Sequence, residues 1–323
     1  MTPFAVAITD IQQAAQRLAG RAHCTPVMTC ATLDRLAGRS LFFKCEQFQK
    51  GGAFKFRGAC NAVMRLTPEA AVRGVATHSS GNHAQALALA AKMRGIPAHI
   101  VMPRTASPVK RRAVQEYGGR VVECEPTLEA RETTAAAVVA ETGATLIPPY
   151  NHPDVIAGQG TAALELLEQA PQLDAVVAPV GGGGLLAGVT IAAQAVRPGV
   201  RMFAAEPAGA DDAARSKAAG VLVPQTGPRT IADGLLTSLG ELTWPVLRDR
   251  VERVVTVMEE EIIAAMRLAW ERAKLLIEPS SAVAVAAVLS DQFRALEGLQ
   301  RVGVVLSGGN VNLDDLPWCM RGG

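Results

Sequence analysis

One lysine stands between two phenylalanines in a stretch of otherwise small residues. Residues 51–59 read GGAFKFRGA, so Lys55 is flanked by Phe54 and Phe56. Apolar neighbours desolvate an ammonium group and lower its pKa, and the neutral amine is the form that attacks an aldehyde to make a Schiff base. Because lysines beside aromatic rings more often extend their charge to water, the segment alone indicates only a candidate nucleophile.

Four consecutive glycines, Gly181 to Gly184, follow one apolar run and precede a helical pattern. Glycines at a strand-to-helix junction expose several backbone N–H groups and a helix N-terminus to one anion, which predicts a phosphate site. Gly182, Gly184 and Ala187, with Glu206 after the next apolar run, also fit the G-x-G-x-x-A dinucleotide pattern. A nicotinamide-dependent oxidoreductase is therefore one alternative.

Two polar turns follow other apolar runs. Residues 77–83 read THSSGNH, and a helical pattern begins near Ala84. Hydroxyls and amides at a helix N-terminus can hold a carboxylate, and this group exceeds what a simple helix cap needs. Residues 307–310 read SGGN and could direct a hydroxyl or an amide at a bound ring.

These turns belong to an alternating pattern of strands and helices. Helical periodicity covers residues 84–95 and 185–196. Buried strands are predicted at six apolar runs: 74–80, 98–103, 120–125, 174–180, 200–207 and 302–309. The alternation predicts an α/β fold with parallel sheets, in which ligands bind beyond the carboxyl ends of the strands.

Composition restricts the class of protein. A chain of 323 residues favours two lobes, and a net charge of +2 without a basic tract argues against nucleic acid binding. The six cysteines form no C-x-x-C pair, which fits reduced thiols in the cytoplasm rather than zinc or disulfides. Because no stretch reaches about 18 apolar residues, we expect no membrane span.

Together the motifs resemble the fold-type II pyridoxal-phosphate (PLP) enzymes, specifically the serine racemase and serine/threonine dehydratase group with its 3-hydroxyaspartate dehydratases. The resemblance runs essentially from end to end. It rests on FFKCEQFQKGGAFKFRGA, THSSGNHAQALALAAK, VIAGQGT, PVGGGGLLAG, AAEPAGADD, TIADGL, LLIEPSSAVAVAA and VLSGGNVN. It implies a tryptophan synthase β-like architecture, with a large PLP-binding domain at 1–67 and 153–323 and a small domain at 68–152 carrying the SSGNH loop.

The resemblance also implies roles for individual residues. Lys55 would carry the cofactor as a Schiff base and later serve as the base for the α-proton, with Ser80 on the opposite face. Asn82 would contact the ring hydroxyl, and Ser307 the pyridine nitrogen. Cofactor contacts are expected from Phe54, Lys55, Asn82, Gly181, Gly182, Gly183, Gly184, Gly234 and Ser307. Substrate contacts are expected from Ser79, Ser80, Gly81, Asn82, His83, Arg131 and Thr237.

A divalent cation site is implied by the same resemblance. Glu206, the backbone carbonyl of Ala210, and Asp212 match a site in racemase-like enzymes whose oxygen ligands suit Mg²⁺, Ca²⁺ or Mn²⁺. A structural role for such a cation fits better than a chemical one. A homodimer is expected as well.

The predicted reaction is β-elimination from a small β-hydroxy amino acid, such as L-serine or L-threonine, to a keto acid and ammonia. Serine racemisation competes if Ser80 returns a proton to the α-carbon. A 3-hydroxyaspartate dehydratase is the alternative, and its substrate's second carboxylate would need a cation such as Arg131. Leu236, in the loop 233–238, offers no charge, which favours a neutral substrate. A β-replacement transferase and a non-catalytic binding protein are further alternatives.

Overall fold

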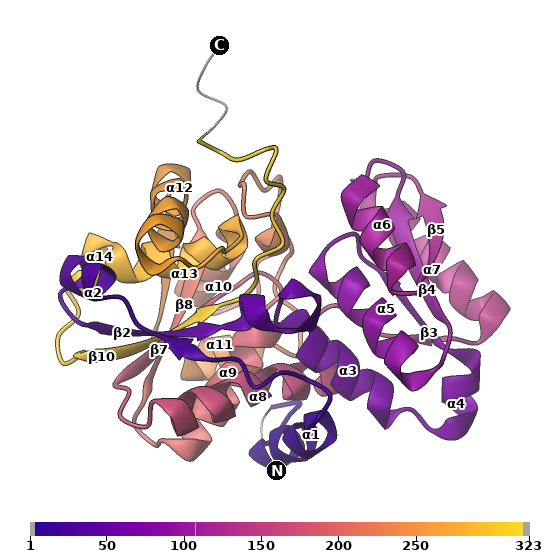
Figure 1. Cartoon of the computed structure of the whole chain (residues 1–323), viewed down its shortest axis with the longest axis horizontal. Coiled ribbons are helices and arrows are strands. Elements are labelled where there is room, and N and C mark those ends of the chain that lie inside the picture. The colour runs from indigo at the N-terminus through magenta and orange to yellow at the C-terminus, as the bar shows by residue number, and fades with distance from the viewer. Residues whose placement is uncertain (1–3, 107, 319–323) are drawn as a thin grey trace.

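Two separate β-sheets organise the protein. The structure, a computed structural model, describes residues 4–106 and 108–318. Figure 1 shows two lobes side by side, each built on one sheet with helices on its faces. The predicted α/β class with mostly parallel sheets is confirmed.

The larger sheet has six strands in the order β1-β2-β10-β7-β8-β9. Its strands are β1 (Val27–Met28), β2 (Ser40–Cys45), β7 (Ala175–Pro179), β8 (Arg201–Pro207), β9 (Arg253–Val257) and β10 (Arg301–Leu306). All neighbours pair in parallel except β1, which is antiparallel to β2. The central strand β7 is buried along its whole length, which suits its AVVAP sequence because both faces are covered by helices.

Helices lie on both faces of this sheet. One hydrophobic core includes residues of α2 (Ala31–Ala37), α12 (Glu259–Leu268) and α13 (Pro279–Leu289). The other includes residues of α1 (Ile8–Leu18), α8 (Pro153–Gln169), α9 (Gly184–Val196) and α11 (Trp244–Arg250). The remaining helices of this lobe are α10 (Asp212–Ala219) and α14 (Asp291–Arg294), with short turns η1 (Glu46–Phe48), η2 (Lys50–Gly52), η3 (Asp233–Leu235) and η4 (Ala269–Ala273).

The smaller sheet has four parallel strands in the order β5-β4-β3-β6. They are β3 (Val75–His78), β4 (Ala98–Pro103), β5 (Arg120–Cys124) and β6 (Thr145–Leu146). Its helices are α4 (Pro68–Arg73), α5 (Asn82–Arg94), α6 (Pro108–Glu116) and α7 (Leu128–Thr142). Left-handed glycines end two of them, Gly95 after α5 and Gly143 after α7, because glycine adopts positive φ without a steric cost.

Helix α3 (Lys55–Arg65) lies at the junction of the two lobes. Phe56, Cys60 and Val63 share a hydrophobic core with Val75 and Leu87 of the smaller lobe. The same helix packs closely on α8, whose Gly158 leaves room for the backbone of Arg57 and Gly58. The predicted boundaries, 1–67 and 153–323 against 68–152, stay a prediction, and α3 contacts both sides of them.

Two further features concern the cysteines and the lengths of the helices. Five cysteines are free thiols, namely Cys24, Cys30, Cys45, Cys60 and Cys124, whereas Cys319 lies outside the described residues. Within residues 4–106 and 108–318, no helix combines the length and the apolar character needed to cross a bilayer.

Candidate active site

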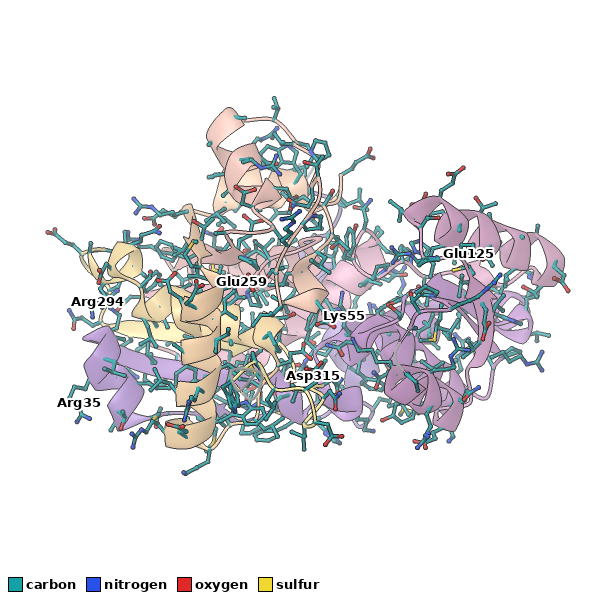
Figure 2. All side chains as sticks on the ribbon, turned by 90° about the horizontal axis from the view of Figure 1, so that it is seen from above. Arg35, Lys55, Glu125, Glu259, Arg294 and Asp315 are labelled. Atoms are coloured by element: carbon teal, nitrogen blue, oxygen red, sulfur yellow. The ribbon has the colours of Figure 1, made fainter. Side chains whose placement is uncertain are left out.

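The polar turns singled out in the sequence follow the carboxyl ends of strands. Ser307 follows β10, Gly181 comes two residues after β7, and Ser79 follows β3 of the smaller sheet. An antiparallel bridge between Ala53 and Gly308 brings the lysine segment to the end of β10. Figure 2 places Lys55 centrally, between the two lobes.

Lys55 begins α3, and its ammonium group lies in a desolvated setting. Its Nζ donates to the carbonyl oxygen of Pro149 at 2.8 Å and lies 5.1 Å from the ring centre of Phe54. Burial lowers the pKa of Lys55 to about 8, against an opposing effect from the charge of Glu278. A lysine with this pKa supplies far more neutral amine near pH 8 than an ordinary lysine does.

The four glycines form a buried turn that opens α9. The helix begins at Gly184, and its N-cap residue, Gly183, has a φ of 84° and supplies no side-chain cap. A Cβ atom at Gly182 would collide with the ring of Tyr150, and one at Gly181 would lie 2.9 Å from the Cα of Leu235. Tyr150 and Leu235 therefore pack directly against the glycine turn. The N-terminus of α9 has no side-chain cap, so its N–H groups are suited to an anion.

A polar cluster joins the smaller lobe to the larger one beside Lys55. Asn82 Nδ2 donates to Glu278 Oε1 at 2.9 Å, and Asn310 Nδ2 donates to Asn82 Oδ1 at 3.0 Å. The backbone N–H of Asn310 donates to Glu278 Oε2 at 3.0 Å. These contacts set which way the Asn82 amide faces. Burial, reinforced by the charge of Asp233, raises the pKa of Glu278 to about 7 although these hydrogen bonds oppose it.

The chain segment from Ile147 to His152 connects several parts of the site. Besides Pro149, which accepts from Lys55, Ile147 O lies 2.9 Å from His83 Nε2. Burial lowers the pKa of His83 to about 3, so its ring is neutral and Nε2 carries the proton donated to that carbonyl. Burial raises the pKa of the Tyr150 hydroxyl. The hydrogen bond between its side chain and Thr237 opposes that shift only in part.

A protein-family model described as "Pyridoxal-phosphate dependent enzyme" matches residues 19–308. The chain belongs to this family of pyridoxal-phosphate-dependent enzymes. This match favours the Schiff-base interpretation of Lys55 over the dinucleotide interpretation of the glycine turn.

Relatives of this PLP enzyme include racemases and a dehydratase. A serine racemase of Arabidopsis thaliana is 54% identical over 316 residues, which cover 97% of this chain and 96% of the relative. A beta-hydroxyaspartate dehydratase of Paracoccus denitrificans is 50% identical over 309 residues, which cover 96% of this chain and 98% of the relative. The structure of maize serine racemase matches with a TM-score of 0.96 at 49% identity, covering 98% of this chain and 97% of that one.

The described residues fit a PLP group. The uncapped N-terminus of α9 offers buried N–H groups to a phosphate, and Lys55 has the lowered pKa that suits bond formation with an aldehyde. The N–H of Phe54 donates to the carbonyl oxygen of Ser307 at 3.0 Å, which holds the lysine segment at the end of β10, where Ser307 would face the cofactor. Ser307 itself is buried, and the N–H of Gly234 donates to Ser280 Oγ at 2.9 Å.

The predicted substrate residues are only partly brought together. Ser79, Ser80, Gly81, Asn82 and His83 form one loop and the first turn of α5, and all but His83 are partly exposed. Thr237 is exposed and reaches the site through Tyr150. Arg131 is partly exposed on α7. Burial lowers the pKa of His78, the last residue of β3, and the charge of Arg131 adds a smaller effect in the same direction. Arg131 Nε contacts the carbonyl oxygen of Thr127 on the preceding turn, and the structure brings Arg131 toward the end of β3.

The predicted cation ligands gather at the end of β8. Glu206 and Asp212 are fully buried, and one carboxylate oxygen of Asp212, Oδ1, has no hydrogen-bond partner among the described residues. Burial raises the pKa of Glu206 to about 8 and that of Asp212 to about 6. Glu206 also accepts from the N–H groups of Ala213 and Ala214 at 2.8 and 2.9 Å. The Glu206 carboxylate therefore also caps the N-terminus of α10. The oxygen atoms of Glu206 and Asp212 suit a divalent cation, but Glu206 has hydrogen-bond partners without one.

Three residues that the structure places at the site had no role assigned from the sequence: Pro149, Tyr150 and Glu278. Glu278 lies inside LLIEPSSAVAVAA, so its motif was recognised without a function for this side chain. Asn310 ends the SGGN turn, which was expected to direct a hydroxyl or an amide at a bound ring, and its amide donates to Asn82 Oδ1 and to the carbonyl oxygen of Gly51. Tyr150 lies in the turn-rich PPYNHP segment between β6 and α8. Prolines and asparagines bounding an aromatic residue could have marked that segment as an ordered connection.

Proposed function

We propose that this PLP enzyme eliminates water from a small β-hydroxy amino acid, giving a keto acid and ammonia, and also racemises serine. The observation that carries the proposal is the buried setting of Lys55. Its pKa is lowered, its Nζ donates to the carbonyl oxygen of Pro149, and the Ala53–Gly308 bridge holds its segment at the end of β10. The serine racemase and dehydratase names of relatives near 50% identity support both activities.

Bound PLP would supply an electron sink that makes the α-proton of an attached amino acid removable. Within the protein, Lys55 Nζ would take that proton, because its lowered pKa gives a larger fraction of neutral amine near neutral pH than an ordinary lysine has. The N–H groups at the start of α9 would hold the phosphate, and Asn82, fixed by Glu278 and Asn310, would hold the ring hydroxyl. Ser80, in the opposite loop, would return a proton from the other face.

The substrate is proposed to be neutral, serine or threonine. Lys110 forms an ion pair with Asp233 of the loop 233–238 at 2.6 Å, so its charge is already engaged by a carboxylate of the protein. Arg131 is the candidate partner for a second carboxylate, so the 3-hydroxyaspartate alternative makes a specific demand on it. Wild-type kcat/KM for L-serine should exceed that for 3-hydroxyaspartate, and Arg131→Ala should leave serine turnover nearly unchanged. A strong preference for the diacid that disappears in Arg131→Ala would support the alternative.

The proposal is tested by recording the visible absorbance of the purified protein with L-serine while pyruvate and D-serine are measured. We expect a band that shifts on adding serine, with both products formed. Ser80→Ala should abolish D-serine formation and retain pyruvate formation. A protein that cannot be loaded with PLP would overturn the proposal, and loss of both products in Ser80→Ala would remove the assignment of Ser80 to one face.

A divalent cation and a homodimer complete the proposal. The orphaned Asp212 Oδ1 beside buried Glu206 supports a Mg²⁺, Ca²⁺ or Mn²⁺ ion, with the Ala210 carbonyl as a third ligand. The homodimer is proposed from the family resemblance, and Phe48, Leu276 and Leu313 are exposed apolar side chains that a second copy could cover. Free cysteines support a reducing compartment, the cytoplasm. Light scattering of the holoenzyme should give twice the chain mass.

A further inference from the structure

A buried ionic cluster lies on the back of the helix that carries Lys55. It consists of two cations and two anions from four elements, namely Lys44 on β2, Glu46 in η1, Arg57 on α3 and Glu165 on α8. Lys44, Glu46 and Arg57 are at most 1% exposed, and the Glu165 side chain is 20% exposed. Equal numbers of each sign make the cluster neutral, which is how buried charges are tolerated.

Arg57 is the centre of this cluster, and its whole guanidinium group is engaged. The Nε and one terminal nitrogen form a fork on Glu46 at 2.7 and 2.8 Å. Both terminal nitrogens contact Glu165 at 2.7 Å each. Further contacts at 3.2 to 3.4 Å reach Thr161 Oγ1, His23 O and Thr25 Oγ1. Only a planar fork can serve two carboxylates in this way, so lysine cannot replace it.

Lys44 supports the same carboxylate from the other side. Its Nζ donates to Glu165 Oε2 and to the carbonyl oxygen of Thr25, at 2.7 and 2.6 Å. Burial would raise the pKa of Glu165, but Arg57 and Lys44 outweigh it, and the pKa is lowered. Glu165 is therefore an anion that joins α8 to both β2 and α3.

The geometry of α3 links this cluster to Lys55. Two residues along an α-helix differ by about 200°, so Arg57 points away from the site when Lys55 points into it. Gly58 adds a second attachment of this turn to α8, because its N–H donates to Gln159 Oε1 at 3.0 Å. The carbonyl that receives the Lys55 ammonium belongs to Pro149, four residues before α8 begins. Helix α8 and the segment that leads into it therefore contact the first turn of α3 both on its Lys55 side and on its Arg57 side.

We propose that Arg57, held by Glu46 and Glu165, is a positioning residue that aims Lys55 Nζ at the cofactor aldehyde. The inference rests on the proposed role of Lys55 as the PLP-bearing lysine. It also gives a function to two sequence segments, FFKCEQFQKGGAFKFRGA and VIAGQGT with the residues that follow it, which the cofactor contacts alone leave mostly unexplained. If the first turn of α3 shifts, the amine moves relative to a cofactor held independently by the glycine turn on α9.

The test measures how fast PLP is captured by the full-length protein from which the cofactor has been removed, well below the thermal midpoint of each variant. Arg57→Lys keeps the charge but cannot serve both carboxylates, and we expect capture to slow by about tenfold or more, since small misplacements of a reacting group are costly. Arg65→Lys is the matched control. Arg65 lies on the same helix and pairs with Asp154 of α8, but about half of its side chain is exposed. Its capture rate should stay near that of wild type.

A second variant keeps the test decisive if Arg57→Lys does not fold. Glu165 lines a surface cavity of about 360 Å³, so water can solvate the amide in Glu165→Gln. This variant leaves the fork on Glu46 intact, and we expect a smaller slowing of capture in the same direction. Normal capture in folded Arg57→Lys, or in Glu165→Gln when Arg57→Lys does not fold, would overturn the inference even if thermal stability fell.

Lys55→Ala separates this inference from the proposed function. Loss of covalent PLP capture in Lys55→Ala, with normal capture in both cluster variants, would leave the role of Lys55 standing and refute the role of Arg57. Undiminished covalent capture in Lys55→Ala would instead refute the role of Lys55, on which the inference depends.

Discussion

At the scale of single residues, the environment of Lys55 decides its chemistry. The sequence predicted desolvation from two flanking phenylalanines, and the structure shows that only one of them lies by the ammonium group. Phe54 is 5.1 Å from Nζ, whereas Phe56 is buried in the core of the smaller lobe, and Lys50 lies 5.9 Å from its ring. Burial is still the main cause of the lowered pKa. Pro149 and Glu278 could not be anticipated, because their contacts depend on tertiary folding.

The lowered pKa predicts the pH dependence of cofactor binding. Neutral amine is the reactive form, so the rate at which the cofactor-free protein captures PLP should rise with pH and level off above a midpoint near 8. Stopped-flow absorbance over pH 6 to 10 (about two units on either side) measures this midpoint, and two such units span about a hundredfold in amine fraction. A midpoint near the ordinary lysine value would show that Lys55 is solvated.

At the scale of elements, the glycine turn shows how far a motif can be interpreted from sequence. Its place between a buried strand and a helix was predicted, and β7 and α9 confirm it. The reason for glycine at 182 was not predicted, because it depends on the Tyr150 ring, which packs from a distant segment. Strands β1, β2, β6 and β9 were not predicted, and β1 and β6 are only two residues long.

Packing against Tyr150 gives a prediction for Gly182→Ala. The added methyl group would press on the ring, and we expect the free energy of unfolding to fall by about 1 to 3 kcal/mol, as is usual for overpacking. In a Tyr150→Ala background the same substitution should cost about 1 kcal/mol less, because the obstructing ring is gone. Urea unfolding of the four proteins gives this coupling. Strict additivity would mean that Tyr150 is not the reason for glycine.

At the scale of the whole molecule, the site depends on two lobes meeting around one lysine (Figure 2). The fold class and the alternation of elements could be predicted, because they follow from local periodicity. The meeting of Asn82 with Glu278 and Asn310 could not, since no local pattern connects residues so far apart in the chain. The same holds for the cluster around Arg57. Lys44, Glu46 and Arg57 lie inside one recognised motif but had no assigned partners, and Glu165 lies beyond the VIAGQGT motif.

The proposed cation should act on the stability of the whole protein. Mg²⁺ or Ca²⁺ added after chelation should raise the thermal midpoint, and at 100 times the dissociation constant the gain is about 2.7 kcal/mol. Asp212→Asn should reduce this response, because it removes the ligand that bears the unpartnered oxygen. Equal responses from both proteins would place any cation elsewhere.

The most direct test of the account is to find where PLP attaches. The purified holoenzyme is reduced with borohydride, which makes a lysine-linked cofactor permanent, then digested and analysed by mass spectrometry. We predict that the reduced cofactor is found on the peptide containing Lys55 and on no other lysine peptide. Attachment at a different lysine, or no attachment in a protein that turns over serine, would contradict the central claim.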